Sequence, residues 1–224
     1  MSIQTIINGS TDLTISRPSL TSQQMTRSGR LVSNTVNFSR PWRFTFTFNP
    51  GRRYSLAREF VESIDYMDRR YTEDIDIGAT NVNLGYITGY QGDHLNLAQQ
   101  CTLTSVNDYT NSITINVPTG SIDGGYLFKA GDFIQPGRAD GYPYVYTVVS
   151  NVPMPSTSTS LTIMIHRNFL PHNYPATSTF LGKTLSIGTD VRFRVQLVSK
   201  PDTGLGSDQL FKTESAYVLQ EVIV

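Results

Sequence analysis

The chain has 224 residues, 38% of them hydrophobic, and its 18 basic residues balance 18 acidic ones. This composition supports a packed core and a folded, soluble protein, and the zero formal net charge gives no overall attraction to nucleic acid or to an anionic membrane. No apolar run approaches the roughly 20 residues of a bilayer-spanning helix, and residues 1–10 lack the basic start and apolar centre of a signal peptide, which disfavours a membrane or secreted protein.

The first clear element is a strand. Aromatic residues alternate with Arg and Thr over residues 42–48, which predicts a half-buried strand whose aromatic face lies in the core. Asn49-Pro50-Gly51 ends the strand, and Ser55 is the predicted N-cap of a helix over 56–67 with apolar residues at helical spacing. This is the one principal helix that the sequence predicts.

The rest of the chain is predicted to be β. Thr102–Val106 and Ile113–Val117 are expected to form a hairpin. Further strands are predicted at residues 132–135, 144–150, 161–166, 191–197 and 217–224. Short strands at this spacing favour a small β-barrel, so the fold class is mainly β with one principal helix.

Charge is unevenly distributed along the chain. Residues 1–70 contain ten arginines and five acidic residues, and the stretch from Arg17 to Arg53 contains seven arginines without any Asp or Glu. The stretch could form a subunit interface, an ordinary exposed face or a contact with nucleic-acid phosphates. We favour an interface with candidates Arg43, Arg52 and Arg53, because Arg43 lies on the polar face of the aromatic strand and the other two precede the helix. Acidic residues beyond position 70 would complement them in a head-to-tail ring.

Few residues point to catalysis or metal binding. The three histidines, His94, His166 and His172, have no metal-ligand spacing, and Cys101 is expected to pack as a small buried residue. No phosphate-binding or dinucleotide-binding glycine loop and no serine nucleophile motif occurs. We therefore expect no enzyme, no cofactor and no metal.

One acidic cluster is a candidate cation site. Glu73, Asp74 and Asp76 could offer oxygen ligands to calcium, but they do not match the twelve-residue calcium loop. We expect instead that they form a solvated loop after the helix.

Three stretches together resemble bacteriophage tail and baseplate proteins. They are WRFTFTFNPGRRYSLAREFVESID, then GYLFKAGDFIQPGRADGYPYVYTVVS followed by LTIMIHRNF, and VRFRVQLVSKP. The strand followed by a helix is similar to the tail-tube-type domain of tube, hub and distal tail proteins. The resemblance implies a tail-tube-like split β-barrel or sandwich domain from residues 1–79 and 183–224, interrupted by a small inserted β-barrel domain over 80–182.

The resemblance also implies a structural role in the virion tail or baseplate. Distal tail proteins form closed rings, commonly hexameric, that connect the tail tube to baseplate or receptor-binding proteins. Such a protein is made in the host cytoplasm and needs no membrane and no sequence-specific nucleic acid. A basic lumen would attract and slow passing DNA, so the arginines are assigned to subunit interfaces.

Two other functions remain open from the sequence. Tyrosines at 86–90 and 142–146 could stack on sugars in a host-receptor or carbohydrate-binding module, which would lose affinity on Tyr142→Ala or Tyr144→Ala. Alternatively they lie in a β core or an interface. A cell-wall hydrolase would need an acidic cluster with a histidine, and His94→Ala would then abolish activity on peptidoglycan.

Overall fold

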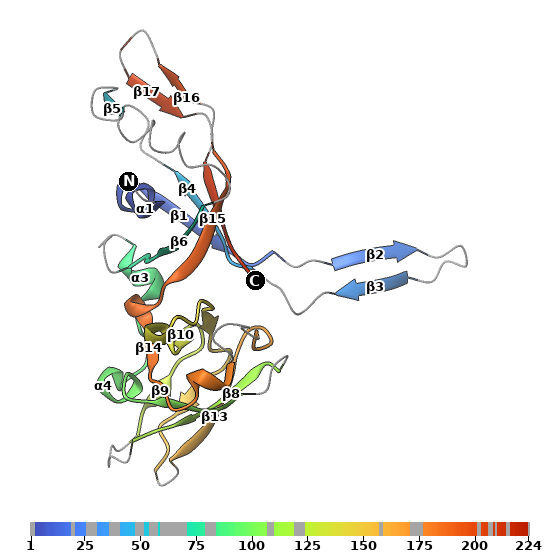
Figure 1. The fold of residues 1–224 in the computed structure, drawn as a ribbon, viewed down its shortest axis with the longest axis vertical. Helices are drawn as coiled ribbons and strands as arrows, with labels where there is room; N and C mark the ends of the chain where they lie inside the picture. Colours follow the sequence, from blue (N-terminus) through green and yellow to red (C-terminus); the bar gives the residue numbers. More distant parts are fainter. Residues whose placement is uncertain are drawn as a thin grey trace.

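The described residues build a five-stranded sheet from both ends of the chain (Figure 1). The computed structural model describes residues 3–18, 21–25, 31–35, 41–47, 52–53, 58, 71–78, 84–106, 110–118, 124–156, 159–170, 177–200, 203–205, 208, 210–213 and 216–223. The strands of this sheet, in spatial order, are β1 (Asp12–Ser16), β4 (Arg43–Thr47), β18 (Tyr217–Glu221), β15 (Phe193–Ser199) and β6 (Thr72–Ile75). All neighbouring pairs run antiparallel.

The predicted aromatic strand is confirmed over the described residues. In β4 the side chains of Phe44 and Phe46 are fully buried, whereas Arg43 and Thr47 are exposed. Burying one such aromatic side chain contributes about 1.5–3 kcal/mol, so this face anchors the sheet to its core. The late strands predicted at 191–197 and 217–224 are confirmed as β15 and β18, which pair with each other.

A short N-terminal helix covers the buried side of the sheet. In α1 (Ile3–Gly9), Ile3 and Ile7 are buried in the same core as Phe44. The Gln4 side chain donates to the carbonyl of Asp76 and accepts from its backbone N–H, both at 2.8 Å. The sequence did not predict this helix, because seven residues carry too little periodicity and tertiary contacts stabilise it. The predicted helix over 56–67 lies outside the described residues, apart from Arg58.

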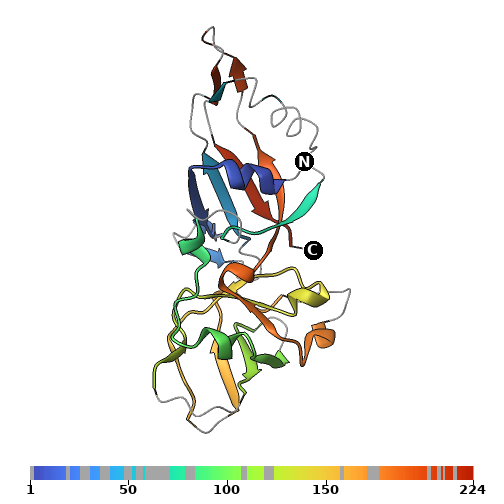
Figure 2. The ribbon, with the colours of Figure 1, turned by 90° about the vertical axis from the view of Figure 1, so that its left-hand side faces the viewer.

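The described residues between β6 and β15 fold around a second hydrophobic core. The predicted hairpin is confirmed as β7 (Thr102–Val106) and β8 (Ser112–Asn116), and β13 (Ser160–Met164) pairs with β8. Two further sheets are formed by β11 (Tyr146–Thr147), β10 (Phe133–Pro136) and β14 (Leu185–Ile187), and by β12 (Val152–Pro153) and β9 (Tyr126–Phe128). Figure 2 shows these elements gathered at the end of the molecule away from the five-stranded sheet.

The predicted closed barrel is not formed by these described residues. Their strands pair in separate sheets of three, three and two strands, and several strands span only two or three residues. Short ladders of this kind leave the sheets open. Two short helices, α3 (Gly85–Thr88) and α4 (Leu95–Ala98), also lie where the sequence predicted no helix. Of the helices in the described residues, none has the length and apolar character that crossing a bilayer requires.

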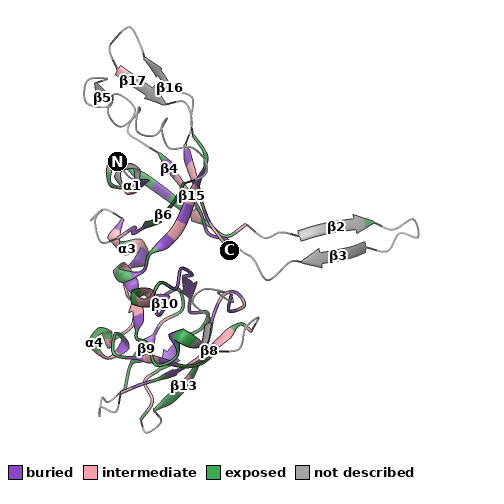
Figure 3. Ribbon diagram, viewed as in Figure 1, coloured by how far each residue is buried: buried purple, intermediate pink, exposed green. Residues whose placement is uncertain are grey.

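The two cores meet rather than remaining separate. Buried residues follow β15 from the five-stranded sheet toward β10 (Figure 3). Phe133 and Val145, which belong to the segment predicted as an insertion, pack in the core of the five-stranded sheet. The Trp42 ring lies 5.5 Å from Phe133 and 5.8 Å from Phe193, which joins the two parts through aromatic contacts.

A buried ion pair reinforces this meeting point. Arg167 donates to both carboxylate oxygens of Glu221, at 2.6 and 2.7 Å, and both side chains are fully buried. The carbonyl of Val145 accepts from Arg167 at 3.0 Å and from the indole N–H of Trp42 at 3.1 Å. Burial lowers the pKa of Arg167, but the neighbouring Glu221 carboxylate outweighs burial and raises that pKa above its usual value. We call Trp42, Val145, Arg167 and Glu221 the joint.

A hairpin and a small sheet extend from the rest of the fold. Strands β2 (Thr21–Met25) and β3 (Leu31–Thr35) form an antiparallel hairpin that projects sideways (Figure 1). At the opposite end from the second core, β16 (Thr203–Leu205), β17 (Leu210–Thr213) and β5 (Arg52–Arg53) form a small sheet.

Candidate interaction site

The five-stranded sheet has one polar side, which we call the open face. Its core-facing residues alternate with residues that are exposed or half-buried. The open face includes Asp12, Thr14, Ser16, Arg43, Thr45, Thr47, Thr72, Asp74, Arg194, Gln196, Val218 and Gln220. Polar residues across all five strands leave this side of the sheet able to contact another molecule.

The structure separates the three predicted interface arginines. Arg43 is exposed on the open face, in register with Ser16 on β1 and Gln220 on β18. Arg52 and Arg53 lie in β5, which pairs with β17 in the small sheet at the far end of the molecule. These arginines therefore do not form one patch within a single chain.

Another arginine of the basic stretch has an internal role. Arg17 donates to the Thr147 hydroxyl at 3.1 Å, and its guanidinium lies 5.1 Å from the centre of the Trp42 ring. The stretch from Arg17 to Arg53 is therefore not uniformly an interface, since one of its members supports the joint.

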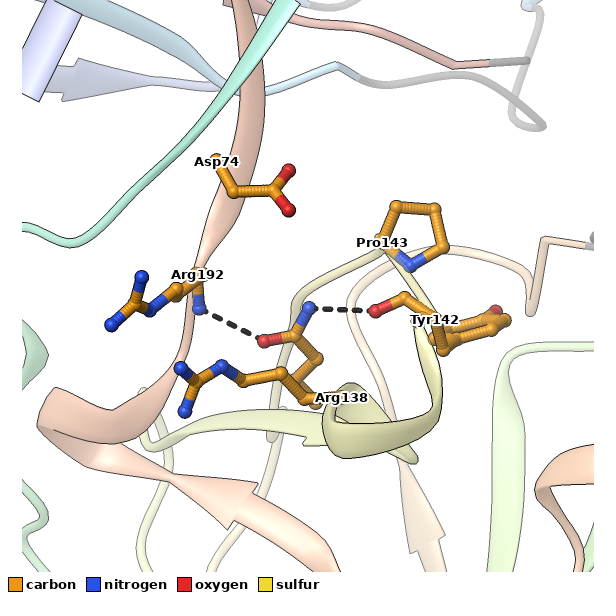
Figure 4. Close-up of a pocket in the computed structure, with 7 residues that line it drawn as sticks. Asp74, Arg138, Tyr142, Pro143 and Arg192 are labelled. Carbon is orange, nitrogen blue, oxygen red and sulfur yellow. Dashed lines mark hydrogen bonds between the residues drawn. The ribbon is translucent and has the colours of Figure 1, made fainter. Parts of the chain in front are cut away.

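A polar hollow of about 200 Å³ opens at the edge of the five-stranded sheet (Figure 4). It is lined by Asp74, Gln135, Arg138, Gly141, Tyr142, Pro143 and Arg192. Asp74 comes from the edge strand β6 and Arg192 directly precedes β15. Gln135 lies in β10, and the other lining residues follow that strand. The hollow thus lies where the sheet meets the second part of the fold.

A buried amide holds the walls of the hollow together. Gln135 is almost fully buried, accepts a hydrogen bond from the backbone N–H of Arg192 at 2.9 Å, and donates to the carbonyl of Tyr142 at 2.9 Å. These are the dashed bonds in Figure 4. Because one side chain bonds the backbone on both sides of the hollow, it fixes the positions of the segments that bear the two arginines.

Glycines and an ion pair fix the turn that carries Arg138. The 3-10 turn Arg138–Asp140 begins after Gly137 and ends before Gly141, which have φ of 59° and 94°. These left-handed conformations favour glycine. A Cβ on Gly137 would lie 2.6 Å from the Phe180 ring, and Asp140 pairs with Lys183 at 2.9 Å.

The hollow presents more positive than negative charge. Neither Arg138 nor Arg192 forms an ion pair with another described residue. In Figure 4 their guanidinium groups extend toward the same side, and the Asp74 carboxylate points away from both, toward Pro143. The arrangement can bind a carboxylate through the arginines and a hydrogen-bond donor through Asp74.

Sequence reasoning did not find this site. It singled out Asp74 as a member of an acidic cluster and did not select Arg138 or Arg192. The one local signal was the Pro-Gly-Arg-Ala-Asp-Gly run at 136–141, in which two glycines bracket a turn carrying an arginine.

The predicted solvated acidic loop is wrong. Glu73 and Asp74 lie in β6, and Glu73 accepts a hydrogen bond from the Ile3 backbone N–H at 2.5 Å. Asp76 is buried next to α1. Within the described parts of the chain, no three His, Cys, Asp or Glu residues are grouped to hold a metal ion.

The predicted sugar-stacking role of Tyr142 and Tyr144 is also wrong, because both side chains are buried. Tyr142 stacks on Phe169 at 5.3 Å between ring centres, and its hydroxyl lies 2.7 Å from that of Tyr146. The core alternative for this loop is confirmed. In the other tyrosine-rich loop, Tyr86 is 74% exposed.

Cys101 and the histidines are not assembled into a reactive site in the described structure. Cys101 is buried, as predicted, and burial raises the pKa of its thiol to about 12. The His94 Nε2 lies 2.9 Å from the Gly124 carbonyl oxygen. The Nδ1 of His166 accepts from the Thr147 backbone N–H at 2.9 Å. His172 lies outside the described residues.

Comparison of the chain with known protein families and with curated proteins finds no match.

Proposed function

We propose that the protein is a structural component of a bacteriophage tail or baseplate that assembles into a ring of the distal tail or hub type. In this proposal the ring connects the tail tube to baseplate or receptor-binding proteins in the virion. The part built from residues 1–79 and 183–224 forms the ring, and residues 80–182 face the neighbouring components. This role needs no catalytic residue.

The projecting β2–β3 hairpin is the observation that carries the proposal. It pairs over five positions and stands away from the five-stranded sheet in Figure 1. An isolated two-stranded hairpin is at best marginally stable in water. Packing against a neighbouring copy would give the hairpin contacts beyond those that the described residues of its own chain supply.

The edges of the five-stranded sheet offer a second means of assembly. Among the described residues, β1 pairs only with β4, and β6 pairs only with β15. Edge strands present unpaired N–H and C=O groups that can pair with another chain. One edge of each copy can thus meet a different edge of the next, which is the heterologous contact that a closed ring requires.

The test is the absolute mass of the protein by light scattering across a dilution series. We expect the wild-type chain to show one discrete oligomer, and a variant in which residues 19–38 are replaced by a six-residue Gly-Ser linker to be monomeric. Replacing residues 155–159 by five Gly-Ser residues is the matched control and should leave the oligomer intact. A wild-type monomer at every concentration, or an unchanged oligomer without the hairpin, would contradict the proposal.

A further inference from the structure

The arginines of the hollow lack an anionic partner within the described structure. Arg138 and Arg192 extend toward the same side, and none of the described ion pairs includes them. Arg192 is exposed and Arg138 is half-buried, so an anion from solution can reach both guanidinium groups. A carboxylate suits this position because its two oxygens match the planar fork of a guanidinium.

The hollow is built before any ligand arrives. Gln135 bonds the backbone of Arg192 and of Tyr142, and the left-handed Gly137 and Gly141 bound the turn that carries Arg138. A ligand therefore needs to order only the two arginine side chains and not the backbone. Preorganisation of this kind reduces the entropic cost of binding.

The size of the hollow limits what it can hold. Its volume of about 200 Å³ is below the range of about 300–1,000 Å³ that is typical of pockets for drug-sized ligands. The hollow is therefore of a size that suits one side chain.

Asp74 distinguishes a peptide from a free anion. Its carboxylate lies in the same hollow and repels any ligand with several negative charges, such as a phosphate. It also accepts hydrogen bonds, and a peptide supplies N–H donors beside an acidic side chain whereas a free phosphate or sulfate supplies few or none. The charge pattern therefore fits an acidic residue within a polypeptide.

We propose that the hollow is a docking site for a glutamate or aspartate side chain of a second, different protein, held by Arg138 and Arg192 with its backbone N–H directed at Asp74. This inference goes beyond the proposed ring, because the occupant belongs to a neighbouring component and not to another copy.

The test is a titration followed by nuclear magnetic resonance of the protein labelled with ¹⁵N, with the backbone signals of Gly141 and Arg192 and the arginine Nε–H signals observed. The probe is a five-residue peptide with blocked ends and one central glutamate between glycine and serine residues. The same peptide with glutamine is the control ligand. We expect the glutamate peptide to shift these signals saturably and the glutamine peptide to bind at least tenfold more weakly.

The variants decide whether the hollow itself binds. Arg138→Gln and Arg192→Gln should each weaken binding of the glutamate peptide at least tenfold, since a charge-assisted hydrogen bond is lost. Arg43→Gln removes an exposed arginine of the same sheet outside the hollow and should leave the affinity unchanged. Each hollow variant should keep the oligomeric mass and unfolding midpoint of the wild type.

Four results would overturn the inference. The two peptides could bind equally, or the Arg138 and Arg192 variants could keep the wild-type affinity. Sulfate or glucuronate could shift these signals with a higher affinity than the peptide, which would assign the site to a free anion or an acidic sugar. Loss of the oligomer in the Arg138→Gln variant would assign the occupant to a second copy of this chain.

Discussion

The buried ion pair of the joint predicts a large loss of stability when only one partner is removed. Replacing Arg167 by methionine leaves the Glu221 carboxylate buried, with the backbone N–H of Trp42 as a remaining donor at 3.1 Å. Breaking a buried pair in this way typically costs about 3–5 kcal/mol. That is a large share of the about 5–15 kcal/mol by which folded proteins are stable.

The double variant separates the cost of an unpaired charge from the value of the pair. Arg167→Met combined with Glu221→Met removes both charges, so it should recover most of the stability lost in Arg167→Met alone. Lys183→Met is the matched control, because it breaks the exposed pair with Asp140. Its expected cost is below about 1 kcal/mol, as for other surface pairs.

Urea unfolding followed by tryptophan fluorescence measures these effects, at one fixed protein concentration so that assembly contributes equally. Trp42 is the single tryptophan of the chain and belongs to the joint, so its emission reports the region that is perturbed. In the Arg167→Met variant the urea concentration at the midpoint of unfolding should fall, while the slope of the free energy of unfolding against urea concentration should stay unchanged. A loss in Arg167→Met as small as that in Lys183→Met, or no recovery in the double variant, would show that an unpaired buried charge is not the cause.

Three further outcomes are expected. Cys101 should resist iodoacetamide at pH 8 until urea unfolds the protein, because burial raises its pKa to about 12; rapid labelling of the folded protein would contradict this. Burial also raises the pKa of Tyr90 to about 12, so its contribution to stability is complete below pH 10 and is lost as pH rises from 10 to 12. The unfolding temperature should therefore fall between pH 9 and pH 11, and it should fall less in the Tyr90→Phe variant. Gly137→Ala should lower the unfolding temperature more than Gly141→Ala, because both have positive φ but only at Gly137 would the new Cβ lie against Phe180; equal effects would contradict the packing argument.

The sequence allowed prediction of elements whose side-chain pattern is strong and local. The alternation in β4 and β15 was sufficient to identify both strands and their buried faces. The predicted strand at 144–150 is present only as the two-residue β11, because its tyrosines pack in the core along an irregular backbone. The α1 helix was missed because contacts from β6 and from Asp76, distant in the sequence, stabilise it.

The hollow could not be predicted for a related reason. Asp74, Arg138 and Arg192 lie far apart in the sequence, and the chain brings them together through strand pairing and the bonds of Gln135. Arg43 was correctly placed on the polar side of its strand, since the period of two fixes the side on which a residue lies. Whether that side contacts a neighbour depends on assembly and not on local pattern.

Negative-stain electron microscopy of the purified wild-type protein can show whether copies of this chain close into a ring. We expect closed rings of one diameter with a central opening, whose class averages share one rotational symmetry. Isolated single-chain particles at every concentration, or open filaments without closure, would contradict this expectation.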